Sequence, residues 1–221
     1  ILTRQDKILM NSRIKVLQEQ KRHAQEKEIK TLELSSDSAI CREDVEFLSA
    51  IGKEIYELLE NIYITQAPIL KNREELISYS SSLYADSPEL QEHLYKILKD
   101  RDNLADTYIK PFQALLLHGR SPKLTRSCFG YARLEPPIYE KGRIIRGAIV
   151  SLIPSGPASE VAAPVTSEVI GTLLEEPALL KALQSLNKES FTKQLEEILL
   201  RFYKSTVQTR LHLKTSGAEK V

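Results

Sequence analysis

The chain has 221 residues, of which 42% are hydrophobic and 28% charged, and these values are close to the averages of globular proteins. They exclude a wholly disordered, collagen-like or membrane-embedded chain. Because 31 Lys and Arg residues oppose 30 Asp and Glu residues, the net charge of +1 gives the molecule no overall bias toward nucleic acid or acidic lipid. We expect a soluble, folded chain, and no motif in it identifies a family or a chemistry.

The cysteines and the longest uncharged run bear on the cellular compartment. Cys41 and Cys128 are too few for a disulfide framework, which favours a reducing compartment, cytoplasmic or nuclear. The longest uncharged run, residues 147–159, contains two prolines and is too short to span a bilayer, so we expect no membrane span. The chain opens on Ile1, which leaves an upstream targeting segment open.

Residues 1–34 contain no Pro or Gly and are rich in helix-forming residues, so they are predicted to form one long helix. Its apolar stripe is narrow and fades toward the C-terminal half. The seven-residue spacing of Leu9 and Val16 suggests a coiled-coil seam, although a helix docked by its N-terminal half explains the pattern equally well. In either case the predicted partner-binding residues are Leu2, Leu9, Val16 and Leu17.

Four further helical stretches are predicted up to residue 119. Residues 44–64 carry the cleanest amphipathic pattern in the chain, and residues 68–84 follow with a proline at their start. Ser87 and Pro88 form an N-cap and first-turn pair for a helix that reaches Pro111. Residues 112–118 are predicted to continue as helix until Gly119.

Residues 120–165 are rich in proline and glycine and are predicted to be an irregular connector. Within it, residues 144–153 suit a short helix or a buried strand, and we favour the helix. Three closing helices are expected at 166–176, 177–186 and 189–211. The predicted fold is therefore mainly α, a long N-terminal helix followed by a multi-helix bundle. Its segments are 1–36 (N-terminal helix), 37–119 (first part of the bundle), 120–165 (connector), 166–214 (closing helices) and 215–221 (tail).

No set of residues predicts catalysis, a cofactor or a metal. The four histidines lack metal-ligand spacing, and neither cysteine has a near partner. His118 and Cys128 lie ten residues apart and could pair as base and thiolate, but a small buried cysteine and a polar helix end explain them better. The Gly142–Gly147 loop lacks the Gly-Lys-Ser/Thr ending of a phosphate loop. The sequence therefore predicts no catalytic, cofactor-binding or metal-binding residue.

Residues 119–146 carry seven basic residues against two acidic ones, with aromatic residues between them. Guanidinium groups can neutralise phosphates while aromatic rings stack on unpaired bases. The candidate nucleic-acid contacts are Arg120, Lys123, Arg126, Tyr131, Arg133, Arg143 and Arg146. The competing interpretation is that this segment docks on the acidic stretch 31–60 or on a partner.

Two functions from different classes follow. The leading hypothesis is a non-enzymatic interaction or scaffold subunit that binds another protein, or a second copy, through residues 1–34. The alternative is an RNA or single-stranded nucleic-acid protein that uses residues 119–146. An enzyme using His118, Cys128 or Tyr131 is the least favoured hypothesis.

Overall fold

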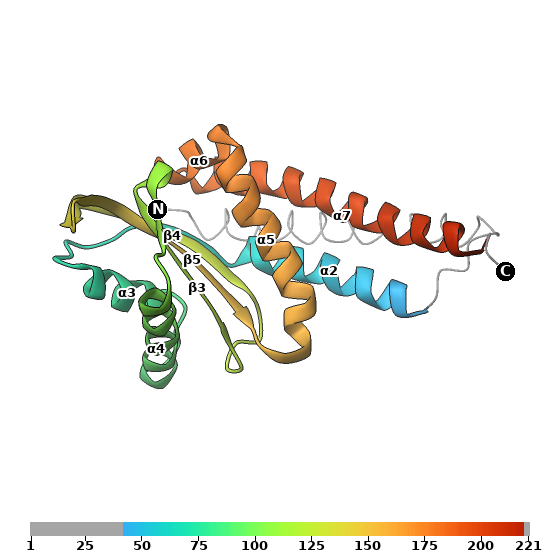
Figure 1. Cartoon of the computed structure of the whole chain (residues 1–221), viewed down its shortest axis with the longest axis horizontal. Coiled ribbons are helices and arrows are strands. Elements are labelled where there is room, and N and C mark those ends of the chain that lie inside the picture. Colours follow the sequence, from blue (N-terminus) through green and yellow to red (C-terminus); the bar gives the residue numbers. More distant parts are fainter. Residues whose placement is uncertain (1–41, 219–221) are drawn as a thin grey trace, which may run out of the picture. The chain divides into compact units, whose positions relative to one another are not determined.

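A five-stranded mixed sheet lies at the centre of residues 42–218, the part of the chain that the computed structural model describes, with side chains described up to residue 210 (Figure 1). Residues 42–210 form one compact unit. Its strands are β1 (Ile62–Gln66), β2 (Tyr108–Ile109), β3 (Ala114–Ser121), β4 (Cys128–Glu140) and β5 (Arg143–Pro154). The helices are α2 (Arg42–Glu60), α3 (Arg73–Ser82), α4 (Pro88–Leu104), α5 (Ser159–Glu175), α6 (Pro177–Gln184) and α7 (Lys188–Ala218), with short 3-10 turns at Lys110–Phe112 and Gly156–Ala158. The expectation of a helical bundle is therefore wrong.

The sheet separates two layers of helices. Its strand order is β1-β4-β5-β3-β2, in which β4 and β5 form an antiparallel hairpin and β3 lies parallel to β5. Helices α3 and α4 cover one face, and α2, α5, α6 and α7 cover the other (Figure 1). Each face has its own cluster of buried apolar side chains, so the architecture is a three-layer α/β/α sandwich.

Strand β3 shows why the sequence pattern was misread. Ala114 belongs to the core under α2 and α5, whereas Leu115 and Leu117 belong to the core under α3 and α4. A strand covered on both faces has no polar side to alternate with its apolar side. The continuous apolar run in β3 was therefore interpreted as part of a helix. The predicted helix at 112–118 is wrong.

The segment predicted as an irregular connector contains the two longest strands. Residues 144–153 form most of β5 rather than a short helix. Prolines 136 and 137 lie where the β4–β5 ladder is interrupted, between Arg133 and Ile138, so they spare the paired stretches on either side. The β4–β5 turn follows at Lys141 and Gly142, both with positive φ.

Predictions that depended on local signals are confirmed. The amphipathic stretch predicted at 44–64 forms α2 as far as Glu60, but its last residues, from Ile62 on, belong to β1. Helix α4 begins at Pro88, and the Ser87 side chain accepts a hydrogen bond from the Leu90 amide at 3.2 Å. The predicted helix at 1–34 lies outside the described residues. Within the described residues, no helix has the length and apolarity needed to cross a membrane.

Candidate functional site

Helix α4 runs along the C-terminal half of β3 and meets it through three side chains spaced one turn apart. β2 pairs with β3 only at Ala114 and Leu115, and no described strand pairs with the outer edge of β3 after Leu115. A polar side chain on α4 can therefore reach β3 there. The pairs are His93 with Ser121, Ile97 with Gly119, and Arg101 with His118.

The hydrogen bonds of His118 define which ring nitrogen is nucleophilic. Arg101 Nε donates to His118 Nε2 at 3.0 Å, and the other ring nitrogen, Nδ1, lies 3.4 Å from the Leu116 carbonyl oxygen. Because a guanidinium can only donate, Nε2 must accept, which leaves the proton on Nδ1 facing the carbonyl. In this hydrogen-bonding pattern the lone pair is on Nε2, next to a permanent cation.

A second cation lies near the same imidazole. Arg120 follows His118 by two positions on β3, so both side chains point to the same face of the sheet. Arg120 is exposed and forms no ion pair within residues 42–210. Since Arg101 is also exposed and His118 is half-buried, this edge of β3 presents two guanidinium groups to solvent.

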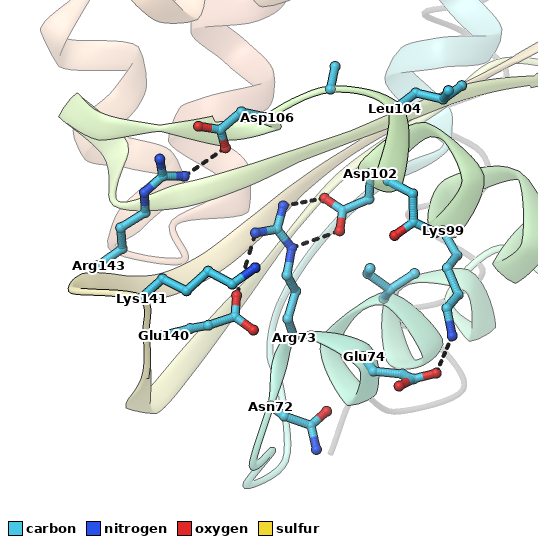
Figure 2. Close-up of a pocket in the computed structure, with 13 residues that line it drawn as sticks. Asn72, Arg73, Glu74, Lys99, Asp102, Leu104, Asp106, Glu140, Lys141 and Arg143 are labelled. Atoms are coloured by element: carbon cyan, nitrogen blue, oxygen red, sulfur yellow. Dashed lines mark hydrogen bonds and ion pairs between the residues drawn. The ribbon is translucent and has the colours of Figure 1, made fainter.

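A charged pocket of about 720 Å³ lies beside this site, between the start of α3, the end of α4 and the β4–β5 turn (Figure 2). Opposite charges pair across it: Arg73 with Asp102, Arg143 with Asp106 at 2.7 Å, and Lys99 with Glu74. The hydrogen bond from Arg143 lowers the pKa of Asp106. Because its cations are largely paired with its own acids, the pocket has little free charge to attract an ion.

The residues predicted to contact nucleic acid are not gathered into one basic surface. Tyr131 is only 3% exposed and lies in the core. Arg133 Nη2 donates to Gln66 at 3.0 Å, and Arg146 Nε donates to Gln113 at 2.6 Å. Arg143 pairs with Asp106, so these three guanidinium groups are each held by a different element. Arg120, Lys123 and Arg126 are exposed, and Arg143 and Arg146 are also exposed although each is bonded to a neighbouring side chain.

His118 and Cys128, weighed above as a base and a thiolate but judged less favourable than a structural role, do not meet in the fold. Strand β5 separates β3 from β4, and Cys128 lies in the core under α3 and α4. Burial raises the pKa of the Cys128 thiol to about 11, so it stays protonated near neutral pH. The predicted partner-binding residues Leu2, Leu9, Val16 and Leu17 lie outside the described residues.

The pairing of Arg101 with His118 was missed by sequence reasoning. The two residues are 17 positions apart, on elements of different type. One signal was available: His118 ends an apolar run of three leucines, where a buried strand meets solvent at its end. Because the run was predicted to be a helix, this signal was not recognised.

Comparisons with known proteins identify one family. Residues 57–198, more than half of the chain, match the family model described as "Phosphoenolpyruvate-dependent sugar phosphotransferase system, EIIA 2". Two solved structures are similar. The nitrogen regulatory protein IIA-Ntr from Neisseria meningitidis has 15% identity and a TM-score of 0.45, covering 64% of this chain and 94% of that one. The IIA mannitol protein from Escherichia coli has 17% identity and a TM-score of 0.41, covering 63% and 96%. A search of curated proteins gave no match.

Proposed function

The chain belongs to the family described as "Phosphoenolpyruvate-dependent sugar phosphotransferase system, EIIA 2", and we propose on this basis that it carries a phosphoryl group on His118 Nε2. Family membership overturns the hypothesis of a helical scaffold subunit that assembles through residues 1–34. It equally overturns the nucleic-acid alternative built on residues 119–146. The observation that carries the new proposal is the 3.0 Å contact between Arg101 Nε and His118 Nε2.

The transfer step uses the lone pair that this contact identifies. His118 Nε2 attacks the phosphorus of a phosphorylated donor, a bond forms between nitrogen and phosphorus, and the bond to the donor breaks with its electron pair leaving on the donor. The Nδ1 proton stays on the ring, facing the Leu116 carbonyl oxygen. Transfer onward to an acceptor is the same step in reverse.

Arg101 and Arg120 can stabilise the negative charge of the phosphoryl group during this step. In phosphoryl transfer, charge spreads over the three equatorial oxygens, and catalysis consists mainly of positioning and electrostatic stabilisation. Arg101 is exposed and its side chain has several rotatable bonds, so it can leave Nε2 for a phosphoryl oxygen as the new bond forms. Arg120 approaches from the same face of β3 and offers a second donor.

A relay of this kind needs a donor and an acceptor, and we infer that both are proteins. His118 lies at a half-buried position on the surface, open to a partner that presents its own reacting group. The chain is regenerated after each transfer, so it acts as a carrier. The relay belongs in the cytoplasm, where phosphoenolpyruvate is formed, and nothing in this family supports the nuclear alternative.

The test is direct phosphorylation of the full chain with phosphoramidate, a small donor that transfers phosphoryl groups to imidazole nitrogens. We expect the mass of one phosphoryl group to be added, an acid-labile linkage, and a 31P resonance of Nε2-phosphohistidine. The His118→Gln variant should lose the modification.

The His93→Gln variant is the matched control, because His93 is half-buried on the neighbouring helix and is also bonded to β3, at 3.0 Å from Ser121 Oγ. It should be phosphorylated like the parent chain. Retention of the phosphoryl group in His118→Gln, or its loss in His93→Gln, would reject the assignment.

A further inference from the structure

Both ring nitrogens of His118 are held by groups that lead back to one cluster of side chains. This cluster consists of Arg73 on α3, Asp102 in the last turn of α4, and Thr107 just before β2. None of the three contacts the imidazole. Their connection to it runs through Arg101 on one side of the ring and Leu116 on the other.

The cluster is tightly bonded, and Figure 2 shows its contact between Arg73 and Asp102. Arg73 Nε donates to Asp102 Oδ2 at 2.7 Å, and Arg73 Nη2 donates to both Asp102 Oδ1 and, at 3.0 Å, Thr107 Oγ1. The Thr107 hydroxyl in turn donates to Asp102. The side chains of Arg73 and Asp102 are 18% and 8% exposed, so solvent screens this fork poorly. Burial opposes the charge on Arg73, but Asp102 and Glu140 outweigh it, and the pKa of Arg73 is raised.

The first connection passes through the end of α4. Asp102 directly follows Arg101 in the helix, and the helix ends two residues later, at Leu104. Terminal turns fray because their last carbonyls lack partners within the helix. The two hydrogen bonds from Arg73 to Asp102 hold this turn against α3. They therefore hold the backbone from which Arg101 extends to His118 Nε2.

The second connection passes through the peptide groups of Thr107 and Leu116. The Leu116 amide donates to the Thr107 carbonyl oxygen at 2.7 Å, and the Leu116 carbonyl oxygen faces His118 Nδ1. The Thr107 side chain is bonded to Arg73 and Asp102, and the residue is 7% exposed. The carbonyl that keeps the proton on Nδ1 is thus held in place from the same cluster.

We propose that Arg73, Asp102 and Thr107 are positioning residues that hold His118 in the tautomer with a free lone pair on Nε2. This inference rests on the proposed function, since it matters only where Nε2 accepts a phosphoryl group. A structural ion pair alone would stabilise α3 against α4. A positioning cluster must in addition set the protonation pattern of a ring that it does not touch.

The experiment uses the full chain and two conservative variants. Asp102→Asn keeps the shape of the side chain but removes the charge that holds Arg73, and Thr107→Val replaces the hydroxyl by a methyl group. The 15N chemical shifts of the His118 ring report which nitrogen carries the proton, without any phosphoryl donor. We expect both variants to move the ring from the pure Nδ1–H form toward a mixture of tautomers. Phosphorylation by phosphoramidate should slow about tenfold or more.

Glu74→Gln is the matched control because it also breaks a contact between α3 and α4 in the same pocket. Glu74 pairs with Lys99 and accepts from the Tyr95 hydroxyl at 2.7 Å, but no connection leads from it to the imidazole. This variant should leave the tautomer and the phosphorylation rate unchanged. Asp102→Glu, which restores a carboxylate, should recover most of the parent behaviour.

The outcomes separate this inference from the proposed function. Ring shifts in Asp102→Asn and Thr107→Val that match those of Glu74→Gln would overturn the positioning role, even if His118 is phosphorylated. A parent chain that is not phosphorylated on His118 would overturn the proposed function, whatever the tautomer. If Asp102→Asn does not fold, Thr107→Val alone decides, because it leaves the charged fork intact.

Discussion

At the scale of single residues, Gly119 sets how closely α4 approaches β3 at the site. A Cβ atom built at Gly119 would lie 2.3 Å from Ile97 Cγ2, far inside van der Waals contact. Ile97 is β-branched and stiff in a helix, so it cannot turn away at little cost. Since Arg101 is one turn further along α4, the absence of a side chain at Gly119 allows Arg101 to reach His118.

We therefore predict that Gly119→Ala lowers stability by roughly 1–3 kcal/mol, the usual cost of overpacking, and also slows phosphorylation of His118. Urea unfolding and the phosphoramidate reaction measure the two effects. Adding Ile97→Ala should restore the phosphorylation rate, because it removes the methyl group that the new Cβ meets. Ile97→Val is the control, because it keeps Cγ2 and should not rescue the rate. Failure of Ile97→Ala to rescue would show that close packing is not the cause.

At the scale of elements, helix caps and amphipathic helices were predictable and the strands were not. Ser87, Pro88 and the apolar rhythm of α2 act within a few residues, so a sequence window contains them whole. The strands depend on partners far along the chain, as where Ala114 aligns with Gly147. Their apolar runs have no period that identifies a strand once both faces are covered. The role of His118 was missed for the same reason, because His118 lies on β3.

Helix α2 carries a buried carboxyl whose ionisation opposes folding. Glu54 is 9% exposed, and neither its Oε1 atom nor the Oγ atom of buried Ser127 has a hydrogen-bond partner among the described residues. Burial raises the pKa of Glu54 in the folded chain, and this effect together with the negative charge of Glu57 outweighs the lowering by the nearby Ser127 hydroxyl and Lys53. The folded state therefore holds this proton to higher pH than the unfolded chain does.

The sign of the pH dependence follows from this difference. Where the folded state binds more protons, stability falls as pH rises, so the Glu54 contribution is most favourable below the unfolded pKa and is lost as pH passes the folded value. We predict that Glu54→Gln is more stable than the parent chain at pH 7, with the difference shrinking toward pH 4. Urea midpoints at several pH values test this. A difference that stays constant with pH would attribute the effect to packing instead.

At the scale of the whole molecule, composition predicted a folded chain of ordinary type but not its architecture. The high helical content was predicted correctly, because six described helices surround the sheet. The five strands between these helices were not predicted. The basic residues of segment 119–146 read as a patch only while that segment was a loop. In the hairpin of β4 and β5, Tyr131 enters the core and Arg133 bonds to Gln66 on the neighbouring strand.

Because the net charge of the chain is close to zero, one phosphoryl group changes the charge of the whole molecule enough to be measured. A phosphoryl group on Nε2 adds about one negative charge while Nδ1 keeps its proton, and about two once that proton is lost, so the net charge of +1 falls to about zero or below. We predict that native electrophoresis of the phosphoramidate-treated chain shows one faster band toward the anode, reversed by acid because the nitrogen–phosphorus bond hydrolyses. His118→Gln should show no such band. Since the chain has four histidines, several stepwise bands, or a band that persists in His118→Gln, would mean that acceptors other than His118 carry the phosphoryl group.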